Sequence, residues 1–283
     1  MLDLISLQPV DYLALGHISL DRTPAGLRLG GTAAYASLTA RALGLRAGIV
    51  TSAGDDAPLQ ALDGVHIVSV PAQHSTSFEN FKLDDRRRQI LHRQAAPILL
   101  DHIPQAWRSA PIIHLAPIAR ELDAGISASL STSLLGITPQ GWLRTWDKSG
   151  QVGACLWEDS QQALRHAGAV VVSMEDLQRD LEQVESLAHQ TRILCITEGP
   201  AGAVLYWNGD RRRFRAPEVN EVDSTGAGDI FAAAFFARLY TTRDPWEAAR
   251  FATQLAARSV TRFGLDGIPT AKEIEDCLTE VLS

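Results

Sequence analysis

The stretch 223–229, Asp-Ser-Thr-Gly-Ala-Gly-Asp, combines small residues with two carboxylates directly before the apolar run IFAAAFFARLY. A small-residue loop that runs into a helix gathers backbone N–H groups and the positive end of the helix dipole at one point, which suits an anion. Glycines there let a phosphate approach the main chain closely. A carboxylate beside such a site can take a proton from an attacking hydroxyl, so Asp229 is a candidate general base. The alternative is structural: Asp229 caps the helix and the glycines form its turn.

A second candidate is the stretch 30–35, Gly-Gly-Thr-Ala-Ala-Tyr, which also leads into a helix. Its simpler interpretation is tight packing of that helix on a sheet. Asp21 follows the apolar run Tyr12–Leu15, and the carboxyl ends of strands are where open α/β sheets bind ligands. Asp21 therefore predicts either a ligand contact or a solvated loop acid.

Short apolar runs alternate with helical patterns along the chain, which predicts a doubly wound, mainly parallel α/β sheet. Most of these runs are continuous rather than alternating, as in a sheet covered on both faces. The expected strands are Tyr12–Leu15, Ala47–Val50, Val65–Val70, Ile112–Leu115, Ala169–Val172, Ile193–Ile196 and Ala203–Tyr206. The expected helices are Thr32–Leu43, Ser160–His166, Glu175–His189, Ile230–Tyr240, Pro245–Phe263 and Ala271–Leu282.

The segment Thr76–Ile98 interrupts this alternation. Its polar and apolar residues alternate around a charged centre, which predicts a two-stranded hairpin outside the main core, with a turn around Asp84–Asp85. We therefore expect one domain over residues 1–283 with a small β excursion.

Composition narrows the class of protein. With 283 residues, 46% of them hydrophobic and a net charge of −7, the chain can bury a large core and lacks the basic character of a nucleic-acid-binding surface. Its three cysteines form no CxxC pair, and it has no uncharged apolar run of about 18 residues. We expect no signal peptide, because no basic region precedes the first apolar residues. We expect a cytoplasmic protein without a membrane partner. A P-loop kinase is disfavoured because the chain has no GxxxxGK[ST] motif. A nicotinamide-dependent enzyme is disfavoured because no GxGxxG follows the first strand.

Taken together, the DSTGAGD stretch, the glycine pair before an Ala-rich helix and the acid after the first strand resemble the ribokinase-like, PfkB-type carbohydrate kinases. The family signature reads DTxGAGD, with which Asp223 and Asp229 align. The resemblance spans Tyr12 to about Leu282. It implies an α/β three-layer sandwich with a central, mostly parallel sheet and a small β lid, here near residues 18–29 and 76–98, through which a homodimer can form.

The resemblance also implies roles for particular residues. Asp229 would be the general base, and the N–H groups of Gly226, Ala227 and Gly228 would form the anion hole. Asp21, Gly30, Gly31 and Tyr35 would bind the acceptor together with Asp229. The nucleotide would contact Thr197, Gly199, Gly202 and Thr225 as well as Gly226 and Gly228.

Some positions depart from the family pattern. Tyr35 stands near the place of an Asn that contacts the sugar. The Asn-x-x-Glu that orients magnesium through water is Ser173-Met174-Glu175-Asp176 here, so Asp176 is the expected Mg²⁺ residue and Glu175 its substitute. Arg144 is either a phosphate ligand or a surface residue of a helix.

The resulting hypothesis is an ATP- and Mg²⁺-dependent kinase that phosphorylates a hydroxyl of a small sugar or polyol. A nucleoside kinase of the same family is one alternative. A catalytically silent relative that only binds sugar or nucleotide is the other, because the magnesium and sugar positions are substituted.

Overall fold

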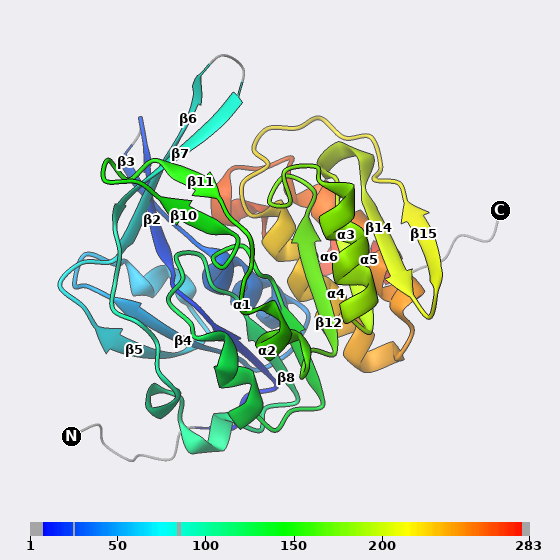
Figure 1. The fold of residues 1–283 in the computed structure, drawn as a ribbon, viewed down its shortest axis with the longest axis horizontal. Helices are drawn as coiled ribbons and strands as arrows, with labels where there is room; N and C mark the ends of the chain where they lie inside the picture. Colours follow the sequence, from blue (N-terminus) through cyan, green and yellow to red (C-terminus); the bar gives the residue numbers. More distant parts are fainter. Residues whose placement is uncertain (1–7, 25, 84–85, 279–283) are drawn as a thin grey trace.

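A large sheet forms the centre of the protein (Figure 1). Within the residues that the computed structural model describes, 8–24, 26–83 and 86–278, it has nine strands in the order β15-β14-β13-β12-β9-β8-β1-β4-β5. Neighbours from β5 to β13 run parallel, and β14 and β15 close one edge as antiparallel strands. The strands are β1 (Tyr12–Leu15), β4 (Ala47–Ala53), β5 (His66–Pro71), β8 (Ile112–Leu115), β9 (Leu134–Ile137), β12 (Ala169–Ser173), β13 (Ile193–Thr197), β14 (Ala203–Trp207) and β15 (Asp210–Phe214).

Helices cover both faces of this sheet, which confirms the three-layer α/β architecture (Figure 1). One face carries α1 (Thr32–Ala42), α4 (Ala227–Thr242), α5 (Pro245–Ser259) and α6 (Ala271–Leu278); the other carries α2 (Ser160–Leu164) and α3 (Leu181–Gln190). Strand β1 shows why its apolar run is continuous. Tyr12 and Ala14 lie in the core beneath the first face, whereas Leu13 and Leu15 lie in the core beneath the second.

A small sheet stands at the carboxyl ends of the central strands. In the described residues its order is β3-β2-β6-β7, formed by β2 (Ser19–Thr23), β3 (Gly26–Gly30), β6 (Thr76–Leu83) and β7 (Arg86–Arg93). It unites the two segments that were expected to form a lid, because β2 pairs in parallel with β6. The turn expected around Asp84–Asp85 lies outside the described residues. A hairpin of β10 (Arg144–Trp146) and β11 (Val152–Ala154) lies beside β7 (Figure 1).

One predicted helix was wrong over its first turns. Residues 174–180 form a turn with Gln178 and Arg179 at positive φ, and α3 begins only at Leu181. The reason is Asp180, whose side chain accepts hydrogen bonds from the N–H groups of Glu182 and Gln183 and so fixes the helix start. At the C-terminus, the part of the expected helix beyond Leu278 lies outside the described residues.

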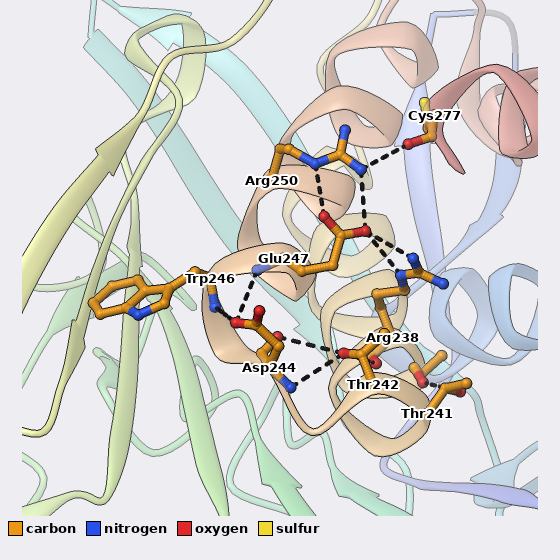
Figure 2. A network of polar contacts seen from close by, with 9 residues as sticks. Arg238, Thr241, Thr242, Asp244, Trp246, Glu247, Arg250 and Cys277 are labelled. Carbon is orange, nitrogen blue, oxygen red and sulfur yellow. Dashed lines mark hydrogen bonds and ion pairs between the residues drawn. The ribbon is translucent and has the colours of Figure 1, made fainter. Parts of the chain in front are cut away.

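A polar network fastens α4, α5 and α6 to one another (Figure 2). The Glu247 carboxylate accepts hydrogen bonds from Arg238 on α4 and Arg250 on α5, at 2.8 Å and 2.7 Å for the shorter contact of each. Arg250 also donates to the carbonyl oxygen of Cys277 on α6 at 3.1 Å. None of the helices in the described residues is long and apolar enough to cross a membrane.

Candidate active site

A cleft of about 1260 Å³ lies where the small sheet and the β10–β11 hairpin meet the carboxyl ends of the central strands and the start of α4. This volume is sufficient for a nucleotide and a small acceptor together. Of the residues singled out from the sequence, the cleft is lined by Asp21, Gly31, Tyr35, Arg144, Asp176, Thr197, Gly199, Gly202, Thr225, Gly226, Ala227, Gly228 and Asp229. Glu175, the expected substitute for Asp176, also lines it. Gly30 does not line the described cleft and lies directly behind Asp21.

Asp229 lies in the first turn of α4. Its carboxylate accepts a hydrogen bond at 2.8 Å from the hydroxyl of Thr32, which is the first residue of α1. Burial raises the pKa of Asp229 to about 6, against the hydrogen bond from Thr32 and the charge of Arg144. The charges of Asp176 and Asp21 raise it further. A carboxyl group with this pKa is ionised at neutral pH yet remains a stronger base than an ordinary aspartate. Thr32 was not predicted as a site residue, although its place directly after the glycine pair was a usable signal.

The loop before α4 is built to bring backbone N–H groups to the cleft. Gly226 has φ +81°, and a Cβ there would collide with the ring of Tyr35. Asp223 holds the loop by accepting hydrogen bonds from the N–H groups of Thr225 and Gly264, both at 3.0 Å. A Cβ at Gly228 would meet nothing within 4 Å, so this residue presents its backbone to open space. Because the first N–H groups of a helix have no carbonyl partner in the helix, this loop can bind an anion.

The structure shows the surroundings of two residues with expected roles. Tyr35 lines the cleft but is only 2% exposed and packs beneath Gly226, so its ring supports the loop, and its contact with the acceptor stays a prediction. The N–H of Ala227 donates to the carbonyl oxygen of Ser224 at 3.2 Å and is therefore already engaged within the turn.

The glycine pair brings α1 close to the small sheet. Gly31 has φ +89°, and a Cβ there would lie 2.8 Å from the His17 carbonyl oxygen. A Cβ at Gly30 would lie 2.6 Å from a carboxylate oxygen of Asp21, so only glycine lets Asp21 occupy its place. Asp21 is further positioned by the Ser19 hydroxyl, which donates to it at 3.0 Å.

Arg144 lies on strand β10 rather than on a helix, and its side chain is only 16% exposed. Its guanidinium lies 3.9 Å from the Asp176 carboxylate and 6.0 Å from the centre of the Phe78 ring on β6. The Ser173 hydroxyl donates to the other oxygen of Asp176 at 2.8 Å. Arg144 and Asp176 thus form an ion pair inside the cleft, which neutralises part of the negative charge there.

A magnesium ion would be held by Asp176 together with ligands that the protein itself does not supply, such as phosphate oxygens and waters. No group of three or more His, Cys, Asp or Glu side chains in the described chain is arranged to hold a metal ion. Mg²⁺ is commonly bound by one or two carboxylates together with substrate phosphates and waters, and one carboxylate at the cleft wall fits that mode.

The end of the cleft where the nucleotide is expected, called the donor end below, lies after strand β13. Thr197 ends this strand, the Glu198 N–H donates to the Gly202 carbonyl oxygen at 2.8 Å, and Gly202 has φ +91° where a Cβ would collide with the Phe214 carbonyl oxygen. The sequence analysis did not predict the part of the wall that α5 and its C-cap supply. These residues are Thr253, Ala256, Ala257 and Val260. Small residues on an amphipathic helix carry no local signal of a ligand.

Comparison with known proteins gives one consistent picture. Residues 161–271 match the family described as pfkB family carbohydrate kinase. The fructokinase of Escherichia coli is 29% identical, over 87% of this chain and 90% of its own length. A pyrophosphate-dependent kinase of the ribokinase family, solved with a pyrophosphate analog and myo-inositol, superimposes with a TM-score of 0.78 at 19% identity, over 94% of this chain and 99% of that one. The ribokinase of Arabidopsis thaliana with ribose and ATP gives 0.71 at 19%, over 97% and 100%. The fold and the family resemblance drawn from the sequence are thereby confirmed.

Proposed function

We propose that this chain, which matches the pfkB family carbohydrate kinases over residues 161–271 and is 29% identical to a fructokinase, transfers the γ-phosphate of ATP to a hydroxyl of a small sugar or polyol, with Asp229 as general base. The observation that carries this proposal is the place of Asp229. It lies beside the glycine loop at the N-terminus of α4 and lines the same cleft as Asp21, the residue expected to bind the acceptor.

The acceptor end favours an uncharged molecule with several hydroxyl groups. Asp21 and Asp229 both face it, and the charge of Arg144 is largely offset by Asp176. A phosphorylated acceptor would meet net negative charge there, whereas hydroxyls can donate hydrogen bonds to the carboxylates.

The small sheet adds an amide pair to this end of the cleft. The Gln89 side-chain NH₂ donates to the Asn80 side-chain oxygen at 2.9 Å, and both residues line the cleft. Arg88, exposed on β7, is a second cation there. Amide groups and Phe78 suit the mixed polar and apolar surface of a sugar or cyclitol.

The donor end supports ATP over pyrophosphate. Besides the Thr197–Gly202 turn, apolar residues line the cleft, namely Pro217, Val219, Ala256, Ala257 and Val260. Pyrophosphate would leave these residues uncovered, whereas a nucleobase would pack against them. The ATP-bound ribokinase with the same fold is consistent with this choice.

The chemistry that these residues can perform is a single displacement. Asp229 takes the proton of the acceptor hydroxyl as its oxygen attacks the γ-phosphorus, and ADP leaves with the electron pair of the broken bond. The N–H groups at the start of α4, including that of Gly228, stabilise the charge on the transferred phosphoryl group. Bound Mg²⁺, held by Asp176 through water and by the donor phosphates, would supply further charge neutralisation. Arg144 would leave Asp176 and contact the phosphoryl group in the transition state, on the acceptor side.

The test is a panel of ATP or pyrophosphate with fructose, ribose, myo-inositol, cytidine and a sugar phosphate, with products identified by mass spectrometry. We expect ATP-dependent phosphorylation of an uncharged polyol or sugar, abolished in Asp229→Asn. A preference for cytidine would select the nucleoside kinase, and pyrophosphate as the better donor would overturn the donor assignment. Tight ligand binding without turnover would favour the silent relative, which the substituted Ser173 position motivates.

A further inference from the structure

The β10–β11 hairpin is docked onto the outer strand of the small sheet. The Leu91 N–H on β7 donates to the Gly150 carbonyl oxygen at 2.9 Å, and the Gln151 side chain donates to the Gln89 carbonyl oxygen at 3.2 Å. Ile90 and Gln151 also pair as an isolated antiparallel bridge. The hairpin therefore contacts β7 beside Gln89, a residue that lines the cleft.

The turn of this hairpin is shaped for that contact. One carboxylate oxygen of Asp147 accepts hydrogen bonds from the Ser149 N–H at 2.8 Å, the Ser149 hydroxyl at 2.6 Å and the Gln151 N–H at 3.0 Å. Gly150 has φ +82°, and a Cβ there would collide with the Leu91 carbonyl oxygen. Only glycine allows the turn to approach β7 this closely.

The inner face of the hairpin belongs to the wall of the cleft. Trp146 and Val152 pack against the cluster that contains Phe78 and Leu91 of the small sheet. Val152, Gly153 and Ala154 line the cleft together with Arg144, which faces Phe78. Displacement of the hairpin would thus move Arg144 and open the cleft on the side of β7.

We propose that the β10–β11 hairpin is a wall of the acceptor site: docked through Gly150, it holds β6 and β7 over the cleft and presents Arg144 to it. This inference rests on the proposed function, because it assigns the acceptor to that end of the cleft. It makes Gly150 a positioning residue for acceptor binding, although the residue itself does not line the cleft. The donor end, along β13 and α5, lies outside the reach of these contacts.

Gly150→Ala tests this, with Gly209→Ala in the β14–β15 turn as its matched control. Both variants add one methyl group at a hairpin glycine with φ near +80°, but a Cβ at Gly209 would meet nothing within 4 Å, and Gly209 does not line the described cleft. Hydrogen exchange of the β6 and β7 amides should be faster on the order of tenfold in Gly150→Ala. The acceptor KM should rise at least about fivefold, with the KM for ATP within about twofold of wild type. Gly209→Ala should behave as wild type in both measurements. Gln151→Ala, which removes the side-chain donor to the Gln89 carbonyl oxygen, should give smaller shifts of the same kind as Gly150→Ala.

Unchanged exchange of β7 and an unchanged acceptor KM in folded Gly150→Ala would overturn the proposal. An equal rise of both KM values would also overturn it, since the hairpin would then not be specific to the acceptor side. The exchange measurement needs no turnover and therefore separates the two claims. Hydrogen exchange of β7 that is faster in Gly150→Ala would support the docking even if the wild-type protein phosphorylates none of the tested acceptors. That lack of phosphorylation would contradict the proposed kinase function alone.

Discussion

Thr32 and Asp229 lie 197 positions apart in the sequence, and their side-chain oxygens lie 2.8 Å apart. Each stands in the first turn of a helix, Thr32 in α1 and Asp229 in α4. The hydroxyl fixes the carboxylate at the point where the two helix starts meet the cleft. This contact therefore joins the glycine pair before α1 to the glycine loop before α4.

Asp229→Asn should lower kcat by about 10²–10⁴, the range expected for loss of a general base. The amide oxygen can still accept the hydrogen bond from Thr32, so the geometry should survive. Steady-state kinetics with the preferred acceptor measures the effect.

The stability of this variant provides the control. Burial raises the pKa of Asp229 above its unfolded value, so ionisation of this carboxyl makes folding less favourable as the pH rises through about 6. Asn carries no such charge, and the melting temperature of Asp229→Asn at pH 8 should equal or exceed that of wild type. A marked loss of stability would show that a lower kcat reflects misfolding.

The pH dependence of kcat/KM should show an acid limb with a pKa of about 6, because only the ionised Asp229 accepts a proton. Arg144 lowers the pKa of this carboxyl and Asp176 raises it. Arg144→Ala should therefore move the acid limb to higher pH, and Asp176→Asn should move it to lower pH. Rate profiles between pH 4.5 and 8.5 measure these shifts; a movement in the same direction in both variants would contradict the assignment of the limb to Asp229.

Gly228→Ala and Gly226→Ala should separate binding from folding. The methyl group at position 228 points into open space, so this variant should keep its melting temperature while the KM for ATP rises or kcat falls by at least about tenfold. The methyl group at 226 collides with Tyr35 at a positive φ and should cost on the order of 1–3 kcal/mol of unfolding free energy. Thermal unfolding and kinetics of both variants check this. Equal stability losses would place position 228 in the packed core of the loop.

Glu247→Gln should destabilise the protein without changing its kinetic constants, since the network in Figure 2 lies away from the cleft. Burial opposes ionisation of Glu247, but the hydrogen bonds from Arg250 and Arg238 outweigh it and lower its pKa. The stabilisation is therefore present above the unfolded pKa near 4.5 and is lost as the pH falls through the lower folded value. We expect a loss of about 1–3 kcal/mol at pH 7, measured by urea unfolding, that shrinks toward pH 4.

The periodicity of the sequence predicted most of the central sheet, since strands such as β1 and β8 are continuous apolar runs that local composition reveals. It missed two strands of this sheet, the short β9 (Leu134–Ile137) and the edge strand β15 (Asp210–Phe214), and placed a helix over residues 175–180. Over residues 175–180 helical periodicity was outweighed by the side chain of Asp180, which caps α3 so that the helix begins at Leu181.

Asp229 and the glycine loop were found from the sequence because their chemistry is local: a carboxylate, flexible glycines and a helix start are adjacent in the chain. The sequence did not reveal that Tyr35 packs beneath Gly226, because the two residues are far apart in the chain. It also did not reveal the surroundings of Arg144, whose strand, ion pair with Asp176 and contact with Phe78 all depend on distant segments.

The sequence by itself determined the layers of the fold and pointed to the glycine loop and Asp229, since these follow from side-chain periodicity and from neighbours a few residues apart. Only the tertiary structure decided which residues line the cleft, how Arg144 is paired, and that Gly150 anchors a hairpin against β7. Those outcomes depend on hydrogen bonds and steric fit between residues tens to hundreds of positions apart. The packing of the whole chain sets those distances, and no local pattern encodes them.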